Sequence, residues 1–223
     1  MEKLFEEFGI EPNNWDYYEL AFTHSTYSVA HDLPSNYERL EFLGDAVLEM
    51  EVSRYLYDHY PNVEEGKLTK LRANYVCQQA LIFYSHRYGL DEYIKISTEN
   101  KGMTDNEILS VTADVFEAFL GALYLDQGID VVNDFLKQTV FKHIHTKRVF
   151  FNDYKSPLKE WCDINEADIE YNILKEYGAP HDKTFIIEVL INGEKLGVGK
   201  GKNKKEAEQN ASKLALESLG ELE

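Results

Sequence analysis

The sequence has few cysteines, no long hydrophobic run, and too few basic residues to offset its acidic ones. Its only two cysteines among 223 residues, Cys77 and Cys162, are too few for a disulfide framework or a zinc cluster. The longest nearly uninterrupted apolar stretch, residues 118–125, is far shorter than the roughly 20 residues that cross a bilayer. The first residues carry acids where a secretory signal needs a basic region and then an apolar one. We therefore expect a cytoplasmic protein with no membrane association.

The charge balance at first argues against a nucleic-acid partner. Lys and Arg number 23 and Asp and Glu number 40, so the formal net charge is −17. A phosphate backbone favours clustered Lys and Arg, which this total does not suggest. Residues 195–205, however, hold five lysines and no acid. Such a cluster predicts either a solvated loop or a patch that binds anions.

The hydrophobic pattern divides the chain into two domains of different class. Hydrophobic residues make up 43% and charged residues 28%, as in ordinary globular proteins. Helical patterns over 37–56, 68–88, 107–125 and 129–145 predict an all-α domain at 1–146, followed by a linker at 147–154. Residues 155–223 predict a small α+β domain with the order α-β-β-β-α. Its signals are alternating strands at 169–173, 185–191 and 196–198, an Asn192-Gly193 hairpin turn, and a last helix capped by Asn203.

Acidic residues recur inside two of the most apolar helical segments. Glu38, Glu41 and Asp45 are spaced i, i+3 and i+7, so they fall within about 60° of one another on a helix. Apolar residues from Leu40 to Leu48 surround them, which predicts a largely buried helix. Asp114 and Glu117 repeat the i, i+3 spacing within a second apolar run.

Buried carboxylates of like charge require compensation. Taking an ion out of water costs several kcal/mol unless it is paired, and Arg39 alone cannot neutralise five acids. The donors are oxygens, without Cys or a pair of His, which favours Mg²⁺ or Mn²⁺ over Zn²⁺. Such a site suits phosphate substrates and hydrolysis by in-line displacement. The alternative is a solvated helix face with i, i+4 salt bridges.

These segments resemble the motifs of one enzyme family. The run ERLEFLGDAVL at residues 38–48 is similar to the ribonuclease III signature, and residues 22–25, 65–73 and 113–122 resemble other motifs of that family. Residues 178–181 and 204–209 resemble the first loop and the last helix start of a double-stranded-RNA-binding domain. The resemblance covers essentially the whole chain, in the bacterial-type domain order.

The resemblance implies an enzyme, a cofactor and a set of site residues. It implies a Mg²⁺-dependent endoribonuclease, with Mn²⁺ as a substitute, that cuts double-stranded RNA to 5′-phosphate and 3′-hydroxyl ends with short 3′ overhangs in rRNA and mRNA processing. It also implies a homodimer through the helical domain. Asp45 and Glu117 would be catalytic, and Glu38 and Glu65 would serve substrate positioning and the cleft at the dimer interface. The implied metal ligands are Glu41, Asp45, Asp114 and Glu117, and the implied RNA contacts are Lys159, Glu160, His181, Lys202, Lys204 and Lys205.

Two other functions compete with this interpretation. One is an RNA-binding protein whose helical domain is inert, and the other is a hydrolase of small phosphates, such as a nucleotide pyrophosphatase. The intact acids argue against the first function. The lysine-bearing second domain argues against the second, because a small substrate does not need it. Cleavage of duplex RNA with Mg²⁺, compared with binding alone or with nucleotide turnover, separates the three.

Overall fold

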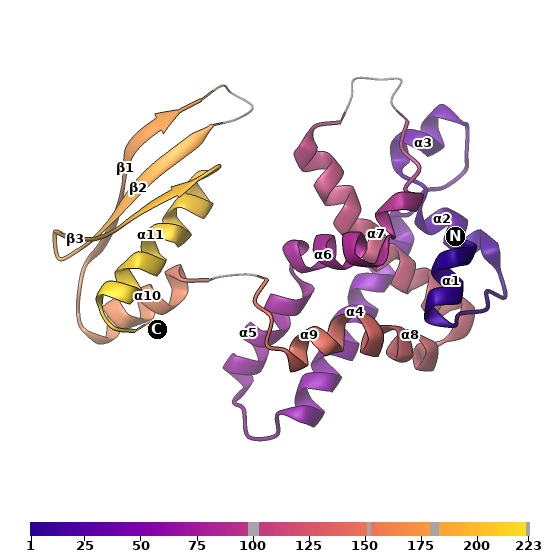
Figure 1. Ribbon diagram of the computed structural model, residues 1–223, viewed down its shortest axis with the longest axis horizontal. Helices are drawn as coiled ribbons and strands as arrows, with labels where there is room; N and C mark the ends of the chain where they lie inside the picture. The colour runs from indigo at the N-terminus through magenta and orange to yellow at the C-terminus, as the bar shows by residue number, and fades with distance from the viewer. Residues whose placement is uncertain (98–102, 151–152, 179–182, 222–223) are drawn as a thin grey trace. The chain divides into compact units, whose positions relative to one another are not determined.

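The computed structural model describes residues 1–97, 103–150, 153–178 and 183–221, and the chain forms two compact units, Met1–Phe151 and Asn152–Glu223. We call them the helical unit and the α/β unit (Figure 1). The predicted order, an all-α domain followed by a small α+β domain, is confirmed. The helices of the helical unit are α1 (Glu2–Phe8), α2 (Trp15–Ala21), α3 (Ser25–Ala30), α4 (Glu38–His59), α5 (Glu65–Val76), α6 (Gln78–Tyr88), a 3₁₀ turn η1 (Asp91–Tyr93), α7 (Asp105–Gln127), α8 (Ile129–Leu136) and α9 (Lys142–His145).

Helix α7 is the central element of the helical unit and packs against α2, α4, α6 and α8. It begins with a capping box, in which Thr104 and Glu107 satisfy each other's backbone N–H groups. Of the residues described, only those of α7 form a helix long and apolar enough to cross a membrane by length and composition. Most of its apolar side chains, such as Phe116 and Phe119, are instead fully buried in the core of the unit.

Two predicted helices are interrupted. The segment 68–88 is not one helix, because Cys77 adopts an extended conformation (φ −71°, ψ 157°) between α5 and α6. The segment 129–145 contains a π-helical stretch, Lys137–Phe141, between α8 and α9. Neither residue 77 nor the π-helical stretch carries a Gly or Pro that would mark the interruption in the sequence.

The α/β unit is a three-stranded antiparallel sheet of order β1-β2-β3, with α11 packed against one face (Figure 1). Its helices α10 (Lys155–Ile164) and α11 (Lys204–Ser218) flank the strands β1 (Ile169–Tyr177), β2 (Thr184–Ile191) and β3 (Glu194–Gly201). The predicted hairpin is confirmed: Ile191 pairs with Glu194, and Asn192 and Gly193 adopt φ of 51° and 77°. The predicted cap is also confirmed, since the Asn203 side chain accepts from the Glu206 N–H.

Small residues let α11 approach β3 at backbone distance. A Cβ on Gly199 would lie 2.1 Å from the carbonyl oxygen of Ala207, and one on Gly197 would lie 2.2 Å from that of Ala211. Ala207 and Ala211 themselves are fully buried. This close contact fixes the N-terminus of α11, with its lysines, relative to the sheet.

Candidate functional site

The carboxylates of the helical unit meet where α4 crosses α7. A Cβ on Gly44 would lie 1.7 Å from the carbonyl oxygen of Glu117, so no larger residue fits there without a backbone shift. Glu41 and Asp45 flank this glycine on α4, and Asp114 lies one turn before Glu117 on α7. The backbone contact therefore brings acids from two helices to one place. A glycine inside a helix costs about 1 kcal/mol relative to Ala, so its presence in the α4 motif was a sequence signal of close approach.

The acids of α4 and α7 influence one another electrostatically. Burial, together with the nearby carboxylates of Asp45, Glu41 and Asp114, raises the pKa of Glu117 to about 8. Burial and the carboxylates of Asp114, Glu38 and Asp45 together raise the pKa of Glu41 to about 7. The four predicted metal ligands and Glu38 thus act on one another within a single cluster, which we call the acid cluster (Glu38, Glu41, Asp45, Asp114 and Glu117).

Asp114 accepts a hydrogen bond from the residue that precedes α4. The Tyr37 hydroxyl donates to Asp114 Oδ2 at 3.0 Å. Burial raises the pKa of Asp114, while this hydrogen bond and the nearby His24 lower it. Tyr37 stands directly before α4 and was not selected from the sequence, where it resembles any core aromatic residue.

The acid cluster opens to solvent more than the sequence predicted. Glu38 and Asp45 are exposed, and Glu41, Asp114 and Glu117 are partly buried. The prediction of a largely buried α4 was wrong at Phe42, whose side chain is 81% exposed. One side of α4 faces the core and the other faces solvent, so an outside substrate can reach the carboxylates.

The donor set fits a hard divalent cation that shares its ligands with a substrate. Within the described ranges, no three His, Cys, Asp or Glu side chains are already arranged to hold an ion. Mg²⁺ commonly binds through one or two carboxylates, completing its shell with waters and substrate phosphates. The charged groups that act on Glu117 are carboxylates rather than protein cations. These carboxylates repel one another, and a cation bound there together with phosphate would reduce that repulsion.

Glu65, the remaining predicted acid of the helical unit, is not part of the acid cluster. It is exposed in the first turn of α5, where it accepts a hydrogen bond from Thr69 at 3.0 Å. It lines a groove of about 450 Å³ between α4 and α5, together with Tyr57 and Arg72 among others. Within one chain the structure thus separates Glu65 from the other predicted site acids.

The predicted RNA contacts of the α/β unit lie on α10 and at the start of α11. Lys159 and Glu160 are exposed on α10, beside a shallow groove of about 500 Å³. Lys202 precedes the Asn203 cap, and Lys204 and Lys205 form the exposed first turn of α11, where the helix dipole also favours anions. The remaining predicted contact, His181, lies outside the described residues.

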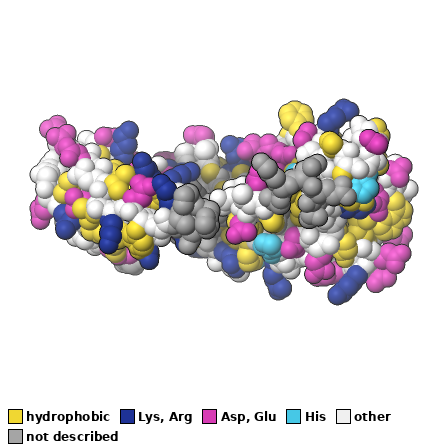
Figure 2. Space-filling view, turned by 90° about the horizontal axis from the view of Figure 1, so that it is seen from above, with side chains coloured by type: hydrophobic (Ala, Val, Ile, Leu, Met, Phe, Trp, Pro, Cys, Tyr) yellow, Lys and Arg dark blue, Asp and Glu magenta, His cyan; other side chains and the backbone are white. Residues whose placement is uncertain are grey.

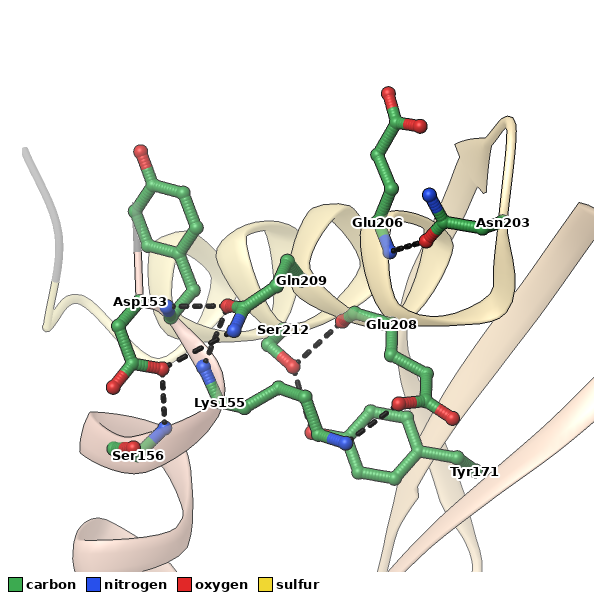
Figure 3. Close-up of polar contacts among 10 residues, drawn as sticks. Asp153, Lys155, Ser156, Tyr171, Asn203, Glu206, Glu208, Gln209 and Ser212 are labelled. Carbon is green, nitrogen blue, oxygen red and sulfur yellow. Dashed lines mark hydrogen bonds and ion pairs between the residues drawn. The ribbon is translucent and has the colours of Figure 1, made fainter. Parts of the chain in front are cut away.

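A polar network ties these two surfaces together (Figure 3). Gln209 Oε1 of α11 accepts from the Tyr154 and Lys155 backbone N–H groups at 2.6 and 3.0 Å, and Gln209 Nε2 donates to Asp153 at 3.2 Å. Lys155 also pairs with Glu208 at 2.6 Å. The start of α10 is therefore fixed to the first turns of α11, which sets the spacing between the two predicted RNA-binding surfaces.

Charge is mixed rather than segregated on the visible surface. Figure 2 shows acidic side chains spread over both units, with Lys and Arg side chains among them. The net charge of −17 is thus compatible with local basic groups such as the first turn of α11.

The two units together define a class: a helical domain with a carboxylate cluster, followed by a domain of the kind that binds double-stranded RNA. A Ribonuclease-III-like family model matches residues 15–144, and a Double-stranded RNA binding motif matches residues 154–219. Ribonuclease 3 from Staphylococcus aureus strain Mu3 is 42% identical over 222 residues, covering 97% of this chain and 90% of the relative. The strain JH9 protein is 41% identical over the same length.

Solved structures agree for the helical unit. A crystal structure of the nuclease domain of ribonuclease III from Campylobacter jejuni has a TM-score of 0.56 and 29% identity, covering 64% of this chain and 95% of that chain. A second structure of that domain, described for flexibility in a region involved in dimer formation, also has a TM-score of 0.56. The chain belongs to the ribonuclease III family. It is a ribonuclease III enzyme that carries a double-stranded RNA binding motif.

Proposed function

We propose that this protein is a Mg²⁺-dependent endoribonuclease that cuts double-stranded RNA to 5′-phosphate and 3′-hydroxyl products with short 3′ overhangs. The single observation that supports the proposal is the close backbone contact of α4 and α7 at Gly44. This contact brings carboxylates from both helices into one cluster that solvent can reach. Processing and decay of rRNA and mRNA precursors in the cytoplasm are the roles that fit such an activity.

We assign a different role to each residue of the acid cluster according to its position. Asp45 and Glu117 are the proposed catalytic groups, and Glu41 and Asp114 join them as metal ligands. A divalent cation bound there would supply a water with lowered pKa and would neutralise charge on the phosphate. Burial and the neighbouring carboxylates raise the pKa of Glu117 to about 8, so it can hold a proton near neutral pH until a cation displaces it. Glu38, exposed at the edge, would contact the substrate.

The α/β unit is proposed to hold the RNA duplex while the helical unit cuts it. A-form RNA is recognised through its shape, with phosphate and 2′-hydroxyl contacts across successive grooves. Lys204 and Lys205 lie at a helix N-terminus, which suits phosphate. Lys159 and Glu160 on α10, with Lys202 and His181, complete the proposed contacts.

A homodimer through the helical unit would complete the cleft. Phe42, Met50 and Tyr57 are 81%, 51% and 74% exposed, and their spacing places them on one side of α4. A self-complementary contact along this stripe would bury apolar surface that a single chain leaves in water. Such a contact would also be the means by which Glu65 of one chain approaches the acid cluster of the other.

The decisive experiment is digestion of a labelled RNA duplex with Mg²⁺, with Ca²⁺ and with EDTA. We expect cleavage with Mg²⁺ only, and products that a ligase joins through their 5′-phosphates. Glu117→Gln should abolish cleavage while keeping duplex binding, because the amide preserves size but weakens metal ligation. Glu6→Gln, an exposed acid on α1, serves as the control of equal charge change.

Three other results would contradict the proposed function or the role of Glu117 in it. Duplex binding without cleavage under Mg²⁺ would support an RNA-binding protein with an inert helical unit. Turnover of nucleotides without RNA cleavage would support a hydrolase of small phosphates. Unchanged turnover in Glu117→Gln would remove Glu117 from the active site.

A further inference from the structure

Tyr37 links the entrance of α4 to a carboxylate of α7. Its ring is buried, at 4% exposure, and its hydroxyl donates to Asp114 Oδ2 at 3.0 Å. Since one carboxylate oxygen is engaged in this way, the orientation of the Asp114 side chain is restricted.

The backbone of Tyr37 is itself held in place by a neighbouring segment. The Tyr37 N–H donates to the carbonyl of Thr23 at 3.0 Å, and Thr23 forms an isolated parallel bridge with Lys95. The His24 ring lies 5.7 Å from the Tyr37 ring, and His24 accepts from the Thr26 N–H at the start of α3. Three segments of the chain therefore converge to fix one phenol.

We propose that Tyr37 is a positioning residue whose hydroxyl orients Asp114 for metal binding. The inference rests on the proposed function, because it assigns a role relative to the same acid cluster. Partners that hydrogen-bond to a ligating side chain fix its orientation, and their loss typically lowers metal affinity or activity about 10–100-fold. Tyr37 contributes through Asp114, and nothing in its geometry requires contact with RNA.

The helical unit contains a matched control for the same interaction. The Tyr18 hydroxyl donates to Asp126 Oδ2 at 2.8 Å, and Tyr18 is fully buried. Asp126, like Asp114, belongs to α7, but it lies near the C-terminal end of the helix, outside the acid cluster. Both tyrosines thus tie a buried phenol to an aspartate of one helix, and only one of those aspartates is a proposed ligand.

The experiment compares the full-length wild type with Tyr37→Phe and Tyr18→Phe. Mn²⁺ binding is followed directly by the electron paramagnetic resonance signal of free Mn²⁺, and duplex cleavage is measured across the same Mn²⁺ range. We expect Tyr37→Phe to raise the Mn²⁺ concentration at half-saturation about 10–100-fold in both measurements, with turnover rising again as Mn²⁺ is increased. Tyr18→Phe should lower the unfolding temperature but keep the wild-type Mn²⁺ midpoint.

The possible results distinguish failure of the inference about Tyr37 from failure of the proposed function. A Tyr37→Phe midpoint equal to that of the wild type would overturn the inference, as would an equal shift in Tyr18→Phe, which would indicate a general loss of rigidity. If Tyr37→Phe does not fold, 4-fluorophenylalanine at position 37 keeps the volume without the donor, and the same shift is expected. A wild type that neither binds Mn²⁺ nor cleaves RNA would overturn the proposed function itself, and the inference with it.

Discussion

Gly44 of α4 and Gly121 of α7 lie against each other at the crossing of the two helices. A Cβ on Gly44 would lie 2.9 Å from the backbone nitrogen of Gly121, and a Cβ on Gly121 would lie 2.2 Å from the carbonyl oxygen of Leu40. Interhelical distances are normally set by side chains at the contact, at about 8–10 Å. Here the absence of side chains allows the two backbones to come into direct contact, and Asp45 and Glu117 of the acid cluster belong to the same turns of the two helices.

Gly44→Ala should therefore destabilise the helical unit and abolish cleavage. The added methyl group would lie 1.7 Å from the carbonyl oxygen of Glu117, so one helix must move away from the other. We expect a loss of about 1–3 kcal/mol of unfolding free energy, as is usual for overpacking a rigid core. Gly66→Ala is the control, because no atom lies within 4 Å of its Cβ position and Ala favours the helix. A Gly44→Ala enzyme with wild-type stability and activity would contradict this view of the crossing.

The raised pKa values of the acid cluster predict how stability depends on pH without metal. Glu41 and Glu117 have folded-state pKa values of about 7 and about 8, against an ordinary value of 4.5. A raised carboxyl pKa contributes stability that is fully present below the unfolded value and is lost as pH rises through the folded value. We expect the unfolding temperature of the metal-free protein to fall between about pH 5 and pH 8.

Thermal unfolding in EDTA at constant ionic strength tests that trend. Glu117→Gln should show a smaller fall over this range than the wild type, and Glu6→Gln should follow the wild type. Mn²⁺ should raise the unfolding temperature more at pH 8 than at pH 6, because ligation requires the ionised carboxylates. A metal effect independent of pH would argue against binding at these two groups.

Phe42→Asp should dissociate the proposed homodimer. The substitution places a charge at the most exposed apolar side chain of the stripe on α4, where a partner would have to desolvate it. We expect a dimer for the wild type and a monomer for the variant in sedimentation velocity at micromolar concentration. Val29→Asp, which changes another exposed apolar side chain away from α4, should remain dimeric. A monomeric wild type would contradict the proposed assembly.

Lys204→Ala with Lys205→Ala should weaken duplex binding and flatten its salt dependence. Each phosphate contact contributes about 0.7–0.9 to the slope of log K against log salt concentration. Loss of two contacts should reduce that slope by about 1–2. The control is Lys213→Ala, which removes a lysine from the other half of α11 that lies near Glu217. An unaltered slope in the double variant would show that the two lysines do not touch phosphate.

Much of the architecture could be predicted from local patterns, and some could not. The Asn192-Gly193 turn and the Asn203 cap depend on residues within a few positions of each other, so both could be predicted from the sequence. The break at Cys77 lacks such a signal, because no Gly or Pro marks the extended residue that separates α5 from α6. The exposure of Phe42 also escaped prediction, since an apolar residue on α4 is equally suited to a core and to an interface.

The sequence by itself determined that acids at helical spacing lie within two apolar helices, and that a helix capped by Asn203, with lysines in its first turn, ends an α+β domain. Periodicity and capping are properties of neighbouring residues, so they do not depend on the rest of the fold. Only the tertiary structure decided which acids meet. Contact at Gly44 and Gly121 joined α4 to α7, left Glu65 apart, and placed the Tyr37 hydroxyl on Asp114. Convergence of residues far apart in sequence follows from packing geometry, and no local pattern encodes it.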